Sequence, residues 1–468
     1  MAYQSLLIAA SALLVTLSFP AWYIWPLIGI ALVPALIVLD RPGTSIKQSL
    51  WWGLAFGTLL SANFHNWLLP LNYWVGWPLI ILAWVAFALY QGVVYGAIFA
   101  AIRWLRPWAP LWITAPILWM IGEWIKGVLP LGNQAANLGY ALVDFTWMAQ
   151  LASVGGVPLL TFGVVLINVL IARSFVTRRL PVAATAAGIL GVWITSGALL
   201  TWHYSSLPTE KSVTVSIIQG NHRQTDKLDV AHLAAIWRHY FNETRNVSAS
   251  SDLVFWPETI VPVPLFDYPG FKSSLQTLSS QSGTSIVGGL PRSVGTHQAN
   301  STFAIDPTHA DAQYYDKHRL MPFGEYLPFR SALSSISALK SITTMLDYLQ
   351  GNSNTPLDVN HMPIATALCL ESLDPKVFKA QTRNGAQLLF VAANNAWYMD
   401  SSAAEKHFSM SRMRAIENHR YLIQAANTGI SGIVDPNGKV VTRSTLNSRT
   451  VVKGAITPLN NRTIYSHF

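Results

Sequence analysis

At the centre of the C-terminal half lies Ile364-Ala-Thr-Ala-Leu-Cys-Leu-Glu-Ser-Leu-Asp374, which contains Cys369, the only cysteine among 468 residues. The apolar run and the turn-like residues after it predict a buried strand over 364–369 that ends at the thiol. A strand end is a rigid place from which to present a nucleophile. A lone cysteine in such a strand is also commonly a small buried apolar residue, so this pattern alone leaves catalysis open.

Two other stretches supply groups that a reactive thiol needs. Asp252-Leu-Val-Phe-Trp-Pro-Glu258 reads as a second buried strand that ends on a carboxylate. Tyr315-Asp-Lys-His-Arg-Leu-Met-Pro-Phe-Gly-Glu-Tyr326 adds Lys317 and Glu325, although its charged residues are also typical of a solvated surface. A thiol, a base and a cation are the components of Cys-dependent acyl transfer. We therefore take Glu258 as the candidate base and Lys317 as the candidate oxyanion stabiliser.

Two further carboxylates are candidates for supporting roles. Glu325 either holds Lys317 in place or acts as a second acid or base. Glu371 follows Cys369 by two residues, so it points to the same side as the thiol if the strand continues. The histidines suggest no catalytic triad, and we find no metal-ligand cluster. One cysteine excludes internal disulfides and multi-cysteine metal sites. The sequence predicts neither a metal nor a cofactor.

The composition divides the chain into two parts. The chain is 51% hydrophobic and 11% charged, whereas soluble globular proteins carry about 25% charged residues. The deficit falls in residues 1–203, which predicts a transmembrane domain there and a globular catalytic domain over 209–468. The net charge of +9 suggests no nucleic-acid partner, because several basic residues lie in short loops and no nucleic-acid motif is present.

A helix needs about 20 apolar residues to cross a bilayer, so seven apolar runs, the first one short, are expected to span a membrane. They lie at about 5–19, 24–39, 50–69, 77–101, 111–129, 153–172 and 181–201. Alternate loops carry the basic residues Arg41, Lys47, Arg103, Arg106, Arg173, Arg178 and Arg179. By the positive-inside rule the N-terminus is cytoplasmic, and seven spans place the globular domain on the opposite side. Glu123 and Lys126 lie one helical turn apart near a span, which fits a functional site or a structural ion pair equally.

The C-terminal part has the pattern of an α/β domain built around a sheet. Strands are predicted near 213–217, 252–256, 285–289, 300–305, 364–369, 387–393 and 430–434, and helices near 229–247, 270–281 and 402–419. Asp435-Pro-Asn-Gly438 predicts the turn of the last strand pair. The Ser- and Leu-rich segment 330–360 is interpreted as a mobile loop or lid.

The order Glu258, Lys317, Cys369 resembles the nitrilase (carbon-nitrogen hydrolase) superfamily, whose members carry a Glu-Lys-Cys triad on an α-β-β-α sandwich. With the N-terminal spans, the chain resembles the bacterial apolipoprotein N-acyltransferase family over nearly its whole length. The motifs are Gln219-Gly-Asn221, Trp256-Pro-Glu258, Lys317-His318, Pro322-Phe-Gly-Glu325, Cys369-Leu-Glu371, Asn394-Asn-Ala-Trp397, Arg412-Met-Arg-Ala-Ile-Glu417, Asn427-Thr-Gly429, Glu123-Trp124 and Gly139-Tyr140.

The resemblance implies Glu258 as general base, Lys317 as oxyanion stabiliser, Cys369 as nucleophile, and Glu325, Glu371 and Trp397 as supporting residues. It implies that Cys369 takes an acyl chain from a phospholipid as a thioester. The N-terminal amine of a diacylglyceryl-cysteine lipoprotein then receives the chain, without a cofactor. We expect a monomer in the bacterial inner membrane with its catalytic domain in the periplasm, and apolar segments around 330–350 and Trp397 that admit acyl chains.

The chain departs from the family pattern at four places. Leu370 stands where the family usually has Tyr, Leu228 near a usual Trp, and Asn395 at a common Asp. The chain also ends at residues 465–468 without the family's usual eighth span. Two alternatives therefore remain: a membrane-tethered nitrilase-type amidase acting on small amides, and a diverged scaffold or conjugal-transfer relative.

Overall fold

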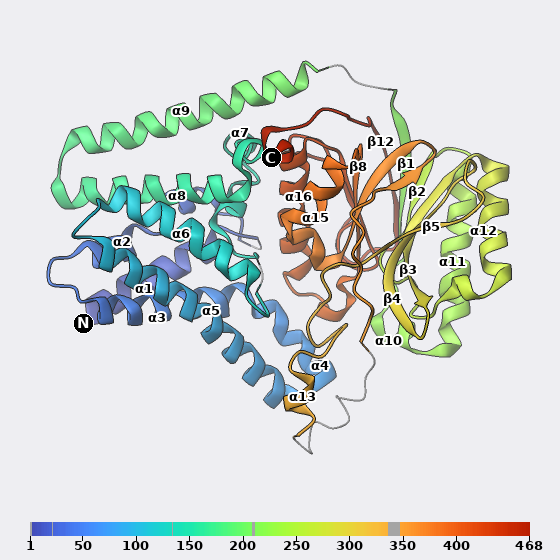
Figure 1. Ribbon diagram of the computed structural model, residues 1–468, viewed down its shortest axis with the longest axis horizontal. Helices are drawn as coiled ribbons and strands as arrows, with labels where there is room; N and C mark the ends of the chain where they lie inside the picture. The colour runs from blue at the N-terminus through green and yellow to red at the C-terminus, as the bar shows by residue number, and fades with distance from the viewer. Residues whose placement is uncertain (1, 21, 133, 208–210, 336–346) are drawn as a thin grey trace.

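The computed structural model describes residues 2–20, 22–132, 134–207, 211–335 and 347–468 (Figure 1). Its N-terminal part is a bundle of helices and its C-terminal part is built on two β-sheets with helices outside them. The predicted fold class, a multi-span helical domain joined to an α-β-β-α sandwich, is confirmed. The last long helix of the bundle ends at Ser205, and the first strand of the sandwich begins at Val213.

The seven apolar runs are helical, because continuous apolar sequence without a β-strand alternation favours this conformation, although the run at 24–39 is divided into two short helices. The long helices are α1 (Ala2–Leu17), α2 (Val33–Asp40), α3 (Ile46–Phe64), α5 (Trp77–Leu105), α6 (Leu111–Val128), α8 (Ala152–Thr177) and α9 (Leu180–Ser205). Short helices η1 (Trp25–Gly29), η2 (Asn66–Leu71), α4 (Asn72–Val75), η3 (Leu138–Leu142) and α7 (Thr146–Ala149) connect them. Within the described ranges, three helices, α5, α8 and α9, are long and apolar enough to cross a membrane.

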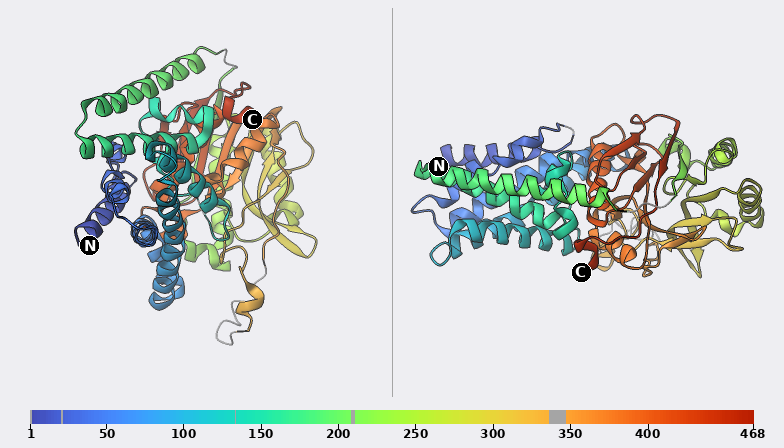
Figure 2. Two further views of the ribbon diagram at one scale, coloured as in Figure 1. Left: turned by 60° about the vertical axis from the view of Figure 1, so that its left-hand side comes forward. Right: turned by 90° about the horizontal axis from the view of Figure 1, so that it is seen from above.

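The basic loops meet at one end of the bundle, around the carboxylate of Asp40. Arg106 Nε donates to Asp40 Oδ1 at 2.7 Å, and Arg173 Nη1 lies 3.6 Å from Asp40 Oδ2. Arg103 Nε donates to the carbonyl of Thr44 at 2.6 Å. These loops lie at the end of the bundle away from the sandwich, as Figures 1 and 2 show. The three basic loops that the sequence singled out therefore share one side of the molecule.

The sandwich consists of two six-stranded sheets among the described residues. The first has the order β12-β1-β2-β3-β4-β5, with β1 (Val213–Gln219), β2 (Leu253–Phe255), β3 (Ser285–Val294), β4 (His297–Ile305), β5 (Gln313–Asp316) and β12 (Thr450–Ile456). The second has the order β11-β10-β9-β8-β7-β6, with β6 (Leu357–Val359), β7 (Met362–Leu368), β8 (Leu388–Ala393), β9 (Leu422–Ala426), β10 (Gly432–Val434) and β11 (Val440–Arg443). In each sheet the central strands are parallel and the edge strands antiparallel.

Apolar side chains from both sheets fill the space between them, as in the contact of Phe255 with Phe390 at 4.8 Å between ring centroids. Three helices lie on the outer side of the first sheet: α10 (Gln224–Leu228), α11 (Val230–Ser248) and α12 (Pro269–Ser282). Two helices cover the second sheet: α15 (Pro375–Arg383) and α16 (Ala403–Asn418). The remaining short helices are η4 (Leu265–Asp267), α13 (Arg330–Leu333), η6 (Cys369–Leu373), η7 (Asn395–Tyr398) and α17 (Ile464–His467). Of the predicted lid over 330–360, residues 336–346 lie outside the described ranges.

The second sheet's helix layer joins the sandwich to the bundle (Figure 1). Every residue of α16 except Glu405 is buried, and Met410, Met413 and Ile416 belong to the same apolar core as the bundle helices. Glu417 accepts hydrogen bonds from the backbone N–H of Val157 and from Arg414, both at 3.1 Å. The two domains therefore share one continuous core rather than meeting through a thin linker.

Candidate active site

The thiol lies just beyond the end of β7, where the chain leaves its extended conformation. Cys369 has φ +51°, in the left-handed region, and opens the short helix η6. This conformation costs a residue with a side chain about 1–2 kcal/mol, and such strain is typical of functional positions. The residue as a whole is partly exposed, although its thiol is buried enough for its pKa to be affected. The predicted strand thus ends one residue earlier than expected, and the turn displays the thiol.

Glu258 is held in the same way after β2. Thr259, the next residue, has φ +45°, and the turn is tied to β3 by the hydrogen bond from Gly289 N to Pro257 O at 3.1 Å. A Cβ at residue 289 would lie 2.6 Å from the Cα of Glu258, so only glycine permits this approach. The close backbone packing fixes the position of the Glu258 carboxylate, which is almost fully buried.

Lys317 lies between two carboxylates directly after β5. Its Nζ is 3.2 Å from Glu258 Oε1 and 2.9 Å from Glu325 Oε1, and its side chain is only 4% exposed. Asn300, on β4, donates to both carboxylates, to Glu258 at 2.9 Å and to Glu325 at 2.5 Å. The backbone N–H of Met321 donates to the second oxygen of Glu325 at 2.7 Å. These bonds hold one cation and two anions in a single buried cluster.

The electrostatics of this cluster keep Lys317 charged. Burial opposes the charge, but the carboxylates of Glu258 and Glu325 outweigh it, and together they raise the pKa of Lys317 well above its ordinary value. The thiol is affected in the opposite sense. Burial, reinforced by the Glu258 carboxylate and opposed by Lys317, raises the pKa of Cys369 to about 12. The resting thiol is therefore protonated at neutral pH and needs a base when it attacks.

This shift predicts the pH dependence of Cys369 alkylation. Because the thiolate is the reactive form, the rate with iodoacetamide is expected to rise about tenfold per pH unit from 7 to 10 without a plateau. Intact mass is a clean readout, since the chain has one cysteine. A small free thiol measured alongside should level off near its pKa of about 8.5. A plateau for Cys369 below pH 9 would contradict the raised pKa.

Glu371 does not lie where the continued strand would have placed it, because β7 ends at Leu368 and the chain turns into η6. Its carboxylate turns back and accepts hydrogen bonds from the backbone N–H groups of Leu368 at 2.9 Å, His318 at 2.7 Å and Arg319 at 3.1 Å, and from the Tyr315 hydroxyl at 3.0 Å. Burial raises the pKa of Glu371 to about 7, against the N–H donors that favour its charged form. Glu371 thus ties the thiol's turn to the segment that carries the lysine.

Trp397 lies at the contact between the sandwich and the bundle. It is 36% exposed, and its ring meets that of Trp74 at 5.2 Å between centroids. Its neighbour Tyr398 packs edge-on against Trp67 at 4.8 Å, and Leu370, next to the thiol, packs in the same cluster. The apolar residue after the nucleophile therefore packs against a cluster that includes Trp67 of the bundle. Leu228, by contrast, is 52% exposed.

The sequence did not reveal the roles of four further residues of the site. Asn300 bridges the two carboxylates, the backbone N–H of Asn394 donates to the Cys369 sulfur, and His407 Nε2 lies 3.0 Å from the Cys369 carbonyl oxygen. Lys227 is 1% exposed, and among the described residues its Nζ has no hydrogen-bond partner. Burial lowers the pKa of Lys227 to about 8, against the nearby Glu258. Asn394 lies in the motif Asn394-Asn-Ala-Trp397, but no local pattern assigns a role to it or to the other three, because these roles arise from contacts between distant strands.

Within the part of the chain that the structure describes, no three His, Cys, Asp or Glu side chains are grouped to hold a metal ion. The Glu258, Lys317 and Cys369 side chains can do covalent chemistry. A thiol displayed on a strained turn, a neighbouring carboxylate and a buried ammonium are suited to attack on a carbonyl carbon, with proton transfer to the carboxylate and charge stabilisation by the cation.

Comparison with known proteins agrees with this geometry. Residues 214–462, more than half of the chain, match the carbon-nitrogen hydrolase family, and residues 11–170 match the apolipoprotein N-acyltransferase N-terminal domain. The chain is 28% identical to the apolipoprotein N-acyltransferase of Vibrio vulnificus, covering 97% of this chain and 90% of that protein. It is also 28% identical to the enzyme of the same name from Geobacter metallireducens, covering 99% and 91%.

Among solved structures, a CN-hydrolase superfamily protein from Xanthomonas campestris aligns with a TM-score of 0.41 at 20% identity, covering 53% of this chain and 91% of that one. The sandwich carries the Glu-Lys-Cys order with its side chains gathered at one place, and the family match spans this whole domain. The chain belongs to the carbon-nitrogen hydrolase family.

Proposed function

We propose that this protein is a membrane enzyme that moves a fatty acyl chain from a phospholipid, through a thioester on Cys369, to the N-terminal amine of diacylglyceryl-cysteine lipoproteins. The observation that carries the proposal is the position of the Glu258–Lys317–Glu325 cluster beside Cys369, at the contact between the sandwich and the helical bundle. The full-length similarity to apolipoprotein N-acyltransferases supports it. We also propose that the enzyme acts as a monomer.

In the first half-reaction the Cys369 sulfur attacks the ester carbonyl of the phospholipid, and Glu258 takes the thiol proton. Lys317 stabilises the oxyanion of the tetrahedral intermediate, because a buried cation acts more strongly there than in water. The C–O bond then breaks, Glu258 returns the proton to the departing oxygen, and a lysophospholipid leaves. The acyl chain remains on sulfur as a thioester.

In the second half-reaction the free α-amine of the lipoprotein attacks the thioester carbonyl. Glu258 takes a proton from the amine, the C–S bond breaks, and the proton passes to the leaving sulfur. The products are an N-acylated lipoprotein and the free thiol. Hydrogen bonds from Asn300 to Glu258 and Glu325, and from Lys317 to Glu325, keep the base and the cation in position through both steps. Glu371 fixes the two segments that carry Cys369 and Lys317 relative to each other.

The location of the site fits lipid substrates. The ring of Trp397 packs against Trp74 of the bundle. Leu370, which follows Cys369 in the chain, packs against the cluster that contains Trp67 of the bundle. We propose a transmembrane domain of seven spans over residues 1–203 in the bacterial inner membrane, and a periplasmic catalytic domain over residues 209–468. The basic loops gathered around Asp40 at the opposite end of the bundle support this orientation by the positive-inside rule.

The test is the intact mass of the detergent-solubilised protein after incubation with phosphatidylethanolamine. We expect an added acyl mass that hydroxylamine removes and that Cys369→Ser does not acquire. Addition of a diacylated lipopeptide should then discharge the adduct and yield an N-acylated peptide.

A membrane-tethered amidase would give a different outcome. It would release ammonia from small amides, and no acyl mass would appear with any phospholipid although iodoacetamide still modifies Cys369. Absence of both activities, with the thiol still reactive, would favour a diverged scaffold.

A further inference from the structure

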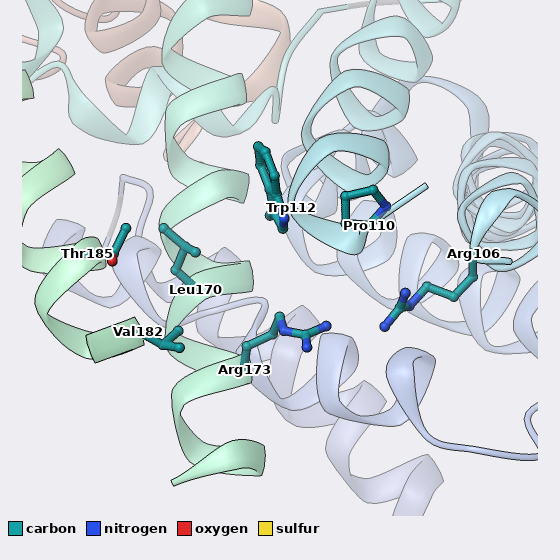
Figure 3. A pocket seen from close by; sticks show the side chains of 7 residues that line it. All are labelled: Arg106, Pro110, Trp112, Leu170, Arg173, Val182 and Thr185. Carbon is teal, nitrogen blue, oxygen red and sulfur yellow. The ribbon is translucent and has the colours of Figure 1, made fainter. Parts of the chain in front are cut away.

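A groove at the basic end of the bundle lies far from the thiol and has no part in the chemistry above. Figure 3 shows it from close by, with the side chains of Arg106 and Arg173 directed toward each other across its floor. Its volume is about 380 Å³. The lining residues are Arg106, Pro110, Trp112, Leu170, Arg173, Val182 and Thr185.

The groove exists because α6 and α9 both pack on α8 without closing over it. Leu170 and Arg173 on α8 form the floor, Trp112 at the start of α6 forms one wall, and Val182 and Thr185 at the start of α9 form the other. The walls are apolar and aromatic, and the basic groups lie at the end nearest the loops. The apolar walls therefore suit an acyl chain, and the basic end of the groove suits a negatively charged group.

Arg106 and Arg173 each have guanidinium N–H groups that Asp40 does not use. Within the described part of the chain, Arg106 bonds to Asp40 through Nε alone, and the ion pair of Arg173 with Asp40 is long, at 3.6 Å. Their side chains are 30% and 33% exposed, so both can meet a ligand. Each guanidinium carries five N–H donors in a planar fork that matches phosphate oxygens.

The surroundings add to the positive field. The loops at this end carry seven basic residues and one acidic residue, Asp40. The basic residues are Arg41, Lys47, Arg103, Arg106, Arg173, Arg178 and Arg179. Basic pockets between membrane helices on the cytoplasmic side are suited to anionic lipid head groups, and tryptophan favours the membrane interface. Trp112 is 48% exposed and stands at this level of the bundle.

We propose that this groove binds the phosphate head group of an anionic phospholipid, held by Arg106 and Arg173, with an acyl chain along Leu170, Val182 and Trp112. Asp40 competes with the phosphate for both arginines. The site lies at the end of the bundle opposite Cys369, so it is distinct from the acyl-donor site and its occupancy does not depend on acyl transfer.

The test uses native mass spectrometry of the delipidated full-length protein in detergent. The probe is ether-linked phosphatidylglycerol, which has no acyl ester to donate, with ether-linked phosphatidylcholine and inorganic phosphate as comparisons. We expect specific binding of phosphatidylglycerol only. Arg106→Gln and Arg173→Gln should each weaken it about fivefold, the effect of one basic residue at an anionic lipid surface. Arg238→Gln with Arg245→Gln, which removes two exposed charges from α11, should leave it unchanged.

Two more variants separate lipid binding from a structural role of the ion pairs. Asp40→Asn frees both arginines and should strengthen binding, whereas a purely structural network would make it behave like the arginine variants. Thr185→Trp fills the groove from an exposed position and should weaken binding, while Val192→Trp on the exposed face of the same helix should not. Equal binding of phosphatidylcholine or inorganic phosphate, or no effect of Thr185→Trp, would overturn the proposal. Thioester formation on Cys369 should be unchanged in all groove variants.

Discussion

Replacing Glu258 with glutamine is expected to lower acyl transfer by about 10²–10⁴-fold, the usual contribution of a general base, while making Cys369 easier to alkylate. Glutamine keeps the shape of the side chain and an oxygen for Lys317, but it cannot take the thiol proton. The Glu258 charge also contributes to the raised pKa of Cys369, and Lys317 opposes it. Removing the carboxylate therefore lowers the thiol pKa and leaves more thiolate at neutral pH.

The two readouts are the rate of thioester formation by intact mass and the rate of iodoacetamide modification at pH 7. Glu325→Gln is the matched control, because it removes the same charge from the same lysine. It should reduce turnover less than Glu258→Gln does. If both variants lost activity equally, Glu258 would not be distinguished as the base. If Glu258→Gln slowed alkylation, its carboxylate would not be raising the pKa of the thiol.

Replacing Lys317 with methionine is expected to remove both activity and stability. Loss of an oxyanion-stabilising group lowers turnover by about 10²–10³-fold. Loss of one partner from a buried ionic cluster costs about 3–5 kcal/mol, because Glu258 and Glu325 then face each other without a cation. The pKa of Lys317 is raised above its ordinary 10.5, so its stabilisation is complete below that pH. The loss of thermal stability should therefore be the same at pH 6 and pH 9.

A double variant separates the two effects of this lysine. Lys317→Met with Glu325→Gln removes one charge of each sign, and it should recover much of the stability while remaining inactive. Thermal unfolding in detergent measures the first and the intact-mass assay measures the second. Recovery of turnover in the double variant would show that the lysine acts only by holding the fold.

Several parts of the site were predictable because they depend on local sequence. Apolar runs that end in Pro-Glu or in the thiol mark strand ends, and the structure places Glu258 three residues after β2 and Cys369 directly after β7. Charge-poor segments predicted that the N-terminal part is helical, and the structure has helices there, three of them long and apolar enough to cross a membrane among the described residues. The turn at Asp435 to Gly438 joins β10 to β11 as predicted.

Other parts depend on contacts that no local pattern contains. Glu371 was expected on the side of the thiol only if the strand continued, and the strand instead ends before Cys369, whose φ is positive, so that the carboxylate turns back to Leu368. Asn300 gains its role only when β4 is brought beside both acidic residues. Strands β5 and β11 are short, partly exposed edge strands without an apolar run, so they gave no periodic signal. The polar sequence of α16 predicted a helix, but not that both its faces are covered.

That covered helix has a consequence for how the enzyme is made. The N-terminal bundle is synthesised before the sandwich. We therefore expect α16 to pack onto helices that are already in the membrane, where Glu417 bonds to Val157 and Arg414 bonds to Tyr140. A fragment starting at residue 211 would present Met410, Met413 and Ile416 to water together with a charged pair that has lost its partners. We therefore expect that the catalytic domain does not fold as a soluble protein on its own, and that its folding follows insertion of the bundle into the membrane.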